Sequence, residues 1–173
     1  AMVVGVNILT YYKNIKKQNQ KCYYPAGDFE NLSLEIQKKY KFNSYYKPIL
    51  VGYSSGASLV YGVLAQAPAN TFKGVIALGF SPEIELDKTL CNGSGLTTKV
   101  VIPGKSSYLN PSNKLTAPFI VLQGTKDQVC SYEVAEKYKI KTLFFFFFFY
   151  YGLSSFLVIG VLCSLFLIFF FIY

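Results

Sequence analysis

Residues 52–56, with the pattern G-x-S-x-G, constrain the fold of this 173-residue chain more than any other segment. They directly follow the apolar run 48–51 and open into residues 57–65, whose composition is typical of a helix. A short buried strand, this pattern and then a helix together indicate a nucleophile elbow, a tight turn that exposes a serine hydroxyl. The glycines are needed because only small residues let the strand and the helix approach so closely. Ser54 is therefore the predicted nucleophile.

The absence of histidine weighs against this interpretation. None of the 173 residues is histidine, and a serine hydrolase of the usual kind needs one as the general base that takes the proton from the serine. The G-x-S-x-G pattern also occurs by chance in many proteins. In addition, any close strand-to-helix turn requires small residues, whether or not it is catalytic. The residues alone leave both interpretations open.

Asp127 is the second chemical signal. It lies a few residues past the apolar run 119–122 and downstream of Ser54, which fits the chain order Ser, Asp, His. Its carboxylate would orient a histidine, whereas the alternative is a cap or turn residue. The backbone amide of Ser55, at the start of the predicted helix, would be one oxyanion donor. The second donor is expected from a loop ahead of Met2, outside this sequence.

Alternating strands and helices predict an α/β fold, with a mainly parallel sheet flanked by helices. The apolar run 2–6 indicates an internal strand rather than a signal peptide, so the chain is expected to begin inside a domain. Asp28 and Ser131 are predicted helix caps. The predicted strands are 2–6, 49–53, 74–80 and 119–122. The predicted helices are 28–40, 55–66 and 131–138. The segment 7–27 is predicted to be irregular.

Residues 1–142 are expected to form one domain, within which 82–118 is a long loop rich in Gly, Ser, Asn and Pro that would cap the site. The tail, 143–173, carries no charge. Its last 21 residues, 153–173, are long enough to span a bilayer as a helix, and the flanking lysines would then place the domain in the cytoplasm. The alternative is a frame-shifted end, since 144–149 are six consecutive phenylalanines.

The net charge of +8 comes entirely from lysines, without any arginine for bidentate contacts to nucleic acid. Abundant Lys, Asn, Ile, Phe and Tyr indicate an A/T-rich genome, so no nucleic-acid partner is predicted. A basic cluster with interleaved tyrosines is expected to be a solvated face; its members are Tyr11, Tyr12, Lys13, Lys16, Lys17 and Lys21.

The four cysteines, Cys22, Cys91, Cys130 and Cys163, show no C-x-x-C spacing, and no histidine accompanies them. No metal site and no cofactor are predicted on these grounds. Cys91 and Cys130 flank a loop-rich segment and are expected to form a disulfide in an oxidising compartment. Free thiols in a reducing compartment are the alternative.

Several blocks in order resemble the bacterial virulence protein family VirJ/AcvB: 3–7 with 11–12, 49–57, 72–82 and 122–130. The resemblance covers roughly residues 2–136. It implies a partial α/β-hydrolase fold, truncated at the N-terminus, with Ser54 as nucleophile and Asp127 as acid. It also implies a periplasmic location, a virulence role and an ester or lipid-like substrate, aminoacylated phospholipid among them.

The chain departs from that family at both ends. The glycine-rich segment ahead of the first strand is missing, and residues 144–149 stand where the histidine should follow. The predicted function is therefore that of a serine hydrolase, which this sequence leaves inactive because it lacks the histidine. The alternative is a non-catalytic binding or membrane-tethered module that keeps the hydrolase fold, with residues 153–173 as its membrane anchor.

Overall fold

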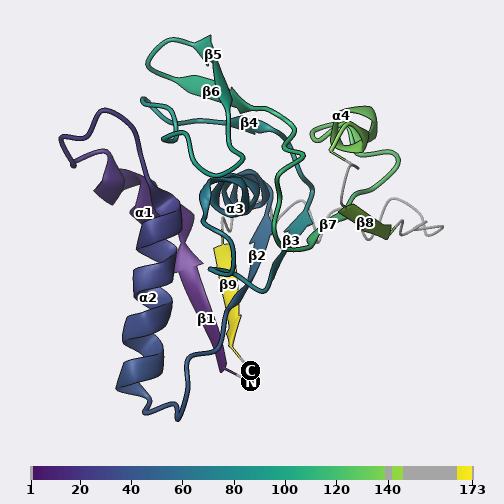
Figure 1. Ribbon diagram of the computed structural model, residues 1–173. Helices are drawn as coiled ribbons and strands as arrows, with labels where there is room; N and C mark the ends of the chain where they lie inside the picture. Colours follow the sequence, from purple (N-terminus) through teal and green to yellow (C-terminus); the bar gives the residue numbers. More distant parts are fainter. Residues whose placement is uncertain (1, 139–141, 146–166, 173) are drawn as a thin grey trace.

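The computed structural model describes residues 2–138, 142–145 and 167–172, which form an α/β arrangement around a six-stranded sheet (Figure 1). Strands β2 (Ile49–Tyr53), β3 (Gly74–Leu78), β7 (Phe119–Leu122) and β8 (Thr142–Phe145) run parallel to one another, while β9 (Leu167–Ile172) is antiparallel to both of its neighbours. The expected parallel sheet is thus confirmed for its centre. In spatial order the strands are β1 (Met2–Asn7), β9 (Leu167–Ile172), β2 (Ile49–Tyr53), β3 (Gly74–Leu78), β7 (Phe119–Leu122) and β8 (Thr142–Phe145).

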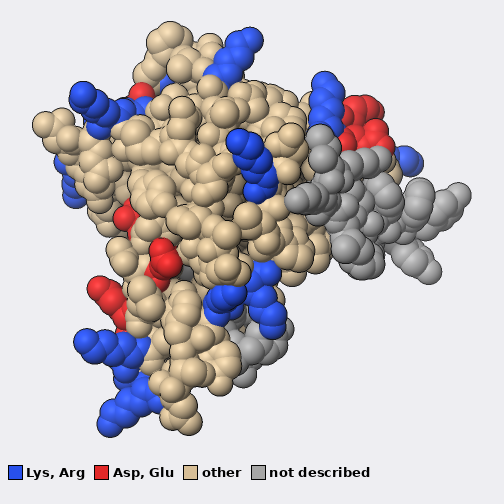
Figure 2. Space-filling view, in the orientation of Figure 1, with Lys and Arg blue, Asp and Glu red and all other residues tan. Residues whose placement is uncertain are grey.

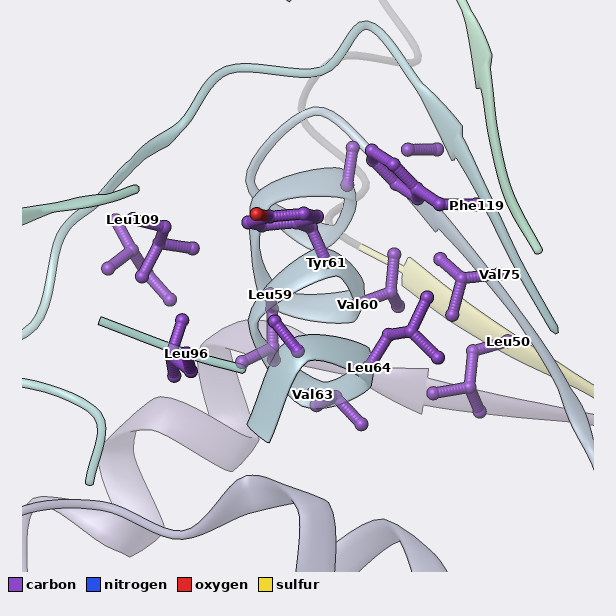
Figure 3. Packing of buried hydrophobic residues seen from close by; sticks show 14 of the residues in the cluster. Leu50, Leu59, Val60, Tyr61, Val63, Leu64, Val75, Leu96, Leu109 and Phe119 are labelled. Atoms are coloured by element: carbon purple, nitrogen blue, oxygen red, sulfur yellow. The ribbon is translucent and has the colours of Figure 1, made fainter. Parts of the chain in front are cut away.

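Four helices occur in the described part of the chain: α1 (Ile8–Ile15), α2 (Pro25–Lys39), α3 (Ser55–Gln66) and α4 (Tyr132–Glu136). Helix α3 is buried on all sides from Gly56 onward, which matches its almost wholly apolar sequence. Figure 3 shows Val60 and Leu64 on the side of the strands and Leu59 on the side of Leu109. The core therefore surrounds α3, which fixes its first turn in place.

Helix α1 contradicts the prediction that residues 7–27 are irregular. The Asn7 side chain caps the helix by accepting a hydrogen bond from the amide of Thr10 at 3.0 Å. Ile8 and Ile15 are buried, and Tyr11 and Tyr12 pack partly against the core. These four positions have the i, i+3, i+4, i+7 spacing of an amphipathic helix, so the signal was present in the sequence.

Helix α2 begins at Pro25, earlier than the predicted cap at Asp28. Proline suits the first turn because its missing N–H would have no acceptor there. Asp28 instead lies within the first turn, where a negative charge is favoured by the helix dipole. Its carboxylate accepts a hydrogen bond from the Tyr11 hydroxyl at 2.7 Å, which ties α1 to α2.

Residues 82–118, predicted to be a loop, contain a second sheet of three antiparallel strands. The order is β4 (Glu83–Ile84), β6 (Ser106–Leu109) and β5 (Thr98–Ile102). This sheet lies beyond α3 as seen from the six-stranded sheet (Figure 1). The strands were missed because they are short and separated by turn residues, which dominate the composition of the segment.

The C-terminal tail contributes strands to the main sheet. β9 occupies the position between β1 and β2, with Phe170 opposite Val4 on one side and Leu50 on the other. The helix predicted over 153–173 is therefore wrong for 167–172, and its other residues lie outside the described ones. A short apolar run rich in Phe and Ile suits a strand as well as a helix, and periodicity does not separate the two.

No helix within the described ranges has both the length and the apolar character that crossing a membrane requires.

The disulfide joins Cys22 to Cys91, with their Cα atoms 4.9 Å apart, so the predicted pairing of Cys91 with Cys130 is wrong. The spacing of the cysteines along the chain could not identify the bonded pair, because contacts between distant segments bring the partners together. Here a parallel β-bridge between Tyr23 and Leu90 places Cys22 beside Cys91. The Gln66 amide donates to the carbonyl oxygens of Tyr23 at 3.0 Å and Cys91 at 2.8 Å. The end of α3 therefore holds both cysteine segments.

We predict that Cys22→Ser lowers the free energy of unfolding by about 4 kcal/mol, because the disulfide closes a loop of 69 residues. Guanidinium titration of the oxidised protein and the variant measures the difference. Non-reducing digestion and mass spectrometry should give a linked pair of peptides containing Cys22 and Cys91. A peptide pair linking Cys91 to Cys130 would contradict the structure.

Candidate functional site

The turn between β2 and α3 places Ser54 in a backbone conformation that L-residues rarely adopt, with φ 53° and ψ −120°. The Ser54 amide donates to the carbonyl of Leu78 at 2.9 Å, which anchors the turn to β3. Strand and helix lie so close that a Cβ at Gly52 would come within 2.2 Å of the Gly56 carbonyl oxygen. The predicted strand, turn and helix are present, and the turn has the strained geometry of a nucleophile elbow.

We predict that Gly52→Ala destabilises the protein by about 3 kcal/mol, because the added methyl group collides with the backbone of Gly56, which cannot rotate away. Chemical denaturation measures this value. Gly104→Ala is the matched control for space, since nothing lies within 4 Å of a Cβ at that position and only its positive φ is unfavourable. Equal losses in the two variants would mean that the contact at Gly52 is not tight.

We also predict that Ser54→Gly is more stable than Ser54→Ala by about 1 kcal/mol. Glycine adopts the positive φ without the strain of about 1–3 kcal/mol that another residue suffers there. About 0.5–1 kcal/mol of this stabilisation is lost, because glycine has greater backbone entropy in the unfolded chain. Alanine removes the hydroxyl but keeps the strain. Thermal and chemical unfolding of both variants test this, and an alanine variant as stable as the glycine variant would show that the turn is relaxed.

A pocket of about 680 Å³ lies beside this turn. The carboxyl ends of β2, β3 and β7 are in register, with Tyr53 opposite Leu78 and Leu78 opposite Leu122, so the loops that follow them meet at one edge of the sheet. Ser54 and Ser55 line the pocket together with Ser58, whose hydroxyl donates to the Ser81 carbonyl at 2.5 Å. The first turn of α3 is therefore one wall of the pocket.

Helix α1 forms another wall through a single face. Leu9, Tyr12, Lys13 and Lys16 line the pocket, and their spacing of i, i+3, i+4 and i+7 places them along one side of the helix. Lys13 and Lys16, expected on a solvated face, thus lie at the site. Figure 2 shows the lysines of the visible face spread around the molecule rather than gathered in one patch.

Two acidic residues complete the charged lining. Glu83 and Glu85, which follow β3, line the same pocket as Lys13 and Lys16. The pocket therefore presents both signs of charge around its apolar and hydroxyl groups. No sequence pattern predicts these glutamates at the site, because their position depends on the path of the chain from β3 into the small sheet.

Ser55, the predicted oxyanion donor, begins helix α3. It is the first residue of α3, so its N–H has no acceptor four residues earlier within the helix. It also lies at the positive end of the helix dipole, which favours a partial negative charge on a bound oxygen. Ser55 and Ser54 both line the pocket, so the structure brings these two predicted residues together.

Asp127 makes the contacts of a turn residue. It follows β7, one strand beyond β3 from Ser54, as predicted for the edge of the sheet. One carboxylate oxygen accepts from the amides of Val129 and Cys130, each at 2.9 Å, and the other accepts from the Gln123 side chain at 3.4 Å. Val129 and Cys130 line the pocket, whereas Asp127 is not among its lining residues. The cap or turn alternative therefore describes its contacts.

Gln123 is a structural residue of the site that was not predicted from the sequence. It is buried at the end of β7, where its amide oxygen accepts from the Phe80 amide at 2.8 Å. Its amide nitrogen donates to the Cys130 carbonyl. Gln123 thus ties the loop of Asp127 to the end of β3. A polar residue directly after an apolar strand was the available signal.

The hydroxyl of Tyr12 is buried and has no hydrogen-bond partner. Burial raises the pKa of this phenol, and the negative charge of Glu85 raises that pKa further, so the hydroxyl stays protonated at neutral pH. Tyr12 lines the pocket with Ser54 and Ser55. Its hydroxyl is therefore a neutral donor enclosed within the protein, while other atoms of the residue line the pocket.

Within the described residues, no three or more His, Cys, Asp or Glu side chains are grouped closely enough to hold a metal ion.

Comparison of the chain with models of protein families, with curated proteins and with solved structures finds no match.

Proposed function

We propose that this chain carries a site of the serine-hydrolase type, in a partial α/β-hydrolase fold, which binds an ester or lipid-like substrate beside Ser54. The observation that carries the proposal is the strained turn at Ser54, with φ 53°, next to a pocket that also receives Ser55. Holding a serine in this conformation costs about 1–3 kcal/mol, and such strain clusters at functional sites. The resemblance to the VirJ/AcvB family in several ordered blocks supports the same assignment.

We expect the site to bind its ligand without hydrolysing it. A serine hydroxyl needs a general base, and the sequence offers no histidine. Asp127 is engaged by its own loop through three hydrogen bonds and does not line the pocket. The same observations support the second candidate function, a non-catalytic binding module that retains the hydrolase fold.

The disulfide supports a location outside the reducing cytosol. Disulfides persist in oxidising compartments such as the periplasm, and Cys22 and Cys91 form one here. We therefore propose a periplasmic protein, in agreement with the family resemblance. The membrane anchor predicted over 153–173 is not part of this proposal, because β9 takes residues 167–172 into the sheet and the rest of that range lies outside the described residues.

The first test of this proposal is binding of ethyl hexanoate, followed by amide chemical shifts. We expect shifts at Ser55, Ser58 and Val129, which line the pocket, and none at Tyr45 on a separate surface. Ser55→Trp should abolish binding because the indole fills the pocket. Ser44→Trp, at an exposed position outside the lining, is the matched control and should bind as the parent does. Shifts that avoid the pocket would contradict the proposal.

The second test is turnover of p-nitrophenyl butyrate. We expect the rate of the parent protein to equal that of Ser54→Ala, because the parent has no base to activate Ser54 and the variant has no nucleophile. A rate that exceeds background in the parent and disappears in Ser54→Ala would show that another residue acts as the base. That result would overturn the conclusion that the site does not hydrolyse its ligand. The proposed binding of an ester in the pocket would still be tested by the chemical-shift experiment.

A further inference from the structure

The outer edge of the small sheet carries an apolar surface that the proposed function does not use. Val100, Val101 and Ile102, consecutive residues of β5, keep between 46% and 51% of their surface exposed. Among the residues that the structure describes, β5 pairs only with β6, so its other edge has no neighbouring strand. Exposed apolar residues that stand together, unlike scattered single ones, mark an interaction surface.

The turn that follows β5 holds this surface away from the rest of the molecule. Residues 99–105 are all exposed, and we call this segment the hairpin tip. The Lys105 amide donates to the Ile102 carbonyl oxygen at 3.0 Å, which closes the turn over the two residues between them. Nothing lies within 4 Å of a Cβ at Gly104, one of those two. The tip is thus a closed projection of the small sheet, on the far side of α3 from the six-stranded sheet (Figure 1).

The charge of the tip is positive. Lys99 and Lys105 stand on either side of the apolar residues, and no acidic residue occurs in the whole segment 88–126. That segment also contains lysines at 88, 114 and 126. The acidic residue in the strands of the small sheet is Glu83, which lies in β4, and β6 separates β4 from β5. The tip therefore complements an anionic partner that also accepts apolar side chains.

Two features favour a lipid surface over an added strand of another protein. The register shifts between Val100 and Ile102, and such a bulge interrupts the row of backbone groups with which a new strand would pair. Successive side chains of a strand point to opposite faces, so three consecutive exposed apolar residues make both faces of the edge apolar. An added strand would leave both faces exposed, whereas the boundary layer of a bilayer surrounds them.

We propose that the hairpin tip binds the surface of an anionic lipid bilayer. Val100, Val101 and Ile102 enter the boundary between the headgroups and the acyl chains, and Lys99 and Lys105 lie beside the lipid phosphates. None of residues 99–105 lines the pocket at the β2–α3 turn, so the inference goes beyond the proposed function and does not depend on it.

Cosedimentation of the full chain with vesicles tests the electrostatic part. We expect binding to vesicles of phosphatidylcholine and phosphatidylglycerol in equal amounts, and much weaker binding to phosphatidylcholine alone. Lys99→Gln and Lys105→Gln should each weaken binding about fivefold, the value of one lysine near an anionic surface. Lys38→Gln is the matched control and should bind as the parent does, since it removes an exposed lysine near the end of α2, away from the small sheet (Figure 1).

The apolar part is tested by Val101→Thr combined with Ile102→Thr. Threonine keeps the β-branched shape that suits a strand and replaces a methyl group by a hydroxyl, which opposes insertion. We expect the double variant to bind the anionic vesicles about tenfold more weakly. Val3→Thr is the matched control and should not change binding, because Val3 is 52% exposed in β1, an edge strand of the six-stranded sheet.

A tryptophan in the tip reports insertion directly. The chain contains no tryptophan, so Ile102→Trp introduces a single fluorophore. We expect its emission to shift to the blue on the anionic vesicles and to be quenched by brominated lipids, while Leu34→Trp, at an exposed position of α2, does neither.

The outcomes separate this proposal from its alternatives. Absence of binding to the anionic vesicles, or binding that is unchanged in the tip variants, would overturn it and leave the proposed function at Ser54 intact. Dimers that form without lipid and dissociate in Val101→Thr with Ile102→Thr would also overturn it, since they would assign the edge of β5 to a second copy of the chain.

Discussion

The contact between β2 and α3 is the constraint on which the site depends. Because Gly52 and Gly56 carry no side chains, the strand and the helix meet backbone to backbone, and the chain between them has room for only one sharp turn. That turn forces Ser54 to a positive φ and directs the first turn of α3 toward the edge of the sheet. A strain of about 1–3 kcal/mol is tolerated because the surrounding core determines the positions of both elements.

The core that holds this turn is built around α3. The helix lies between the six-stranded sheet and the small sheet of 82–118, and apolar residues on several of its sides contact both (Figure 3). At its far end, the Gln66 side chain bonds the backbone of Tyr23, Ala26 and Cys91, which joins α3 to α2 and to the disulfide. The first turn of α3 is thus fixed at one end by glycine contacts and at the other by buried hydrogen bonds.

Local chemistry in the sequence predicted the centre of the fold and one half of the site. Four strands of the main sheet, α3 and the turn at Ser54 follow from apolar runs and from a glycine pattern that has few alternative structures. Helix α1 was predictable from the spacing of Ile8, Tyr11, Tyr12 and Ile15, and the composition of the surrounding segment obscured it. These features depend on neighbours along the chain, which the sequence displays directly.

The remaining features depend on contacts between distant segments. The Cys22–Cys91 disulfide, the insertion of β9 between β1 and β2, and the glutamates in the pocket arise from the path of the chain in space. Asp127 shows the limit most clearly: its position after β7 suits a catalytic acid, and its hydrogen bonds are those of a turn. The difference lies in the amides of Val129 and Cys130, whose orientation no sequence pattern specifies.

The most direct test of this account is a crystal structure of the protein with ethyl hexanoate bound. We expect the ester in the pocket, its carbonyl oxygen about 3 Å from the Ser55 amide, and Ser54 at a positive φ. An ester bound elsewhere, or a Ser54 backbone in the ordinary helical or extended region, would contradict the central claim that the strained turn presents Ser54 to a carbonyl-binding pocket.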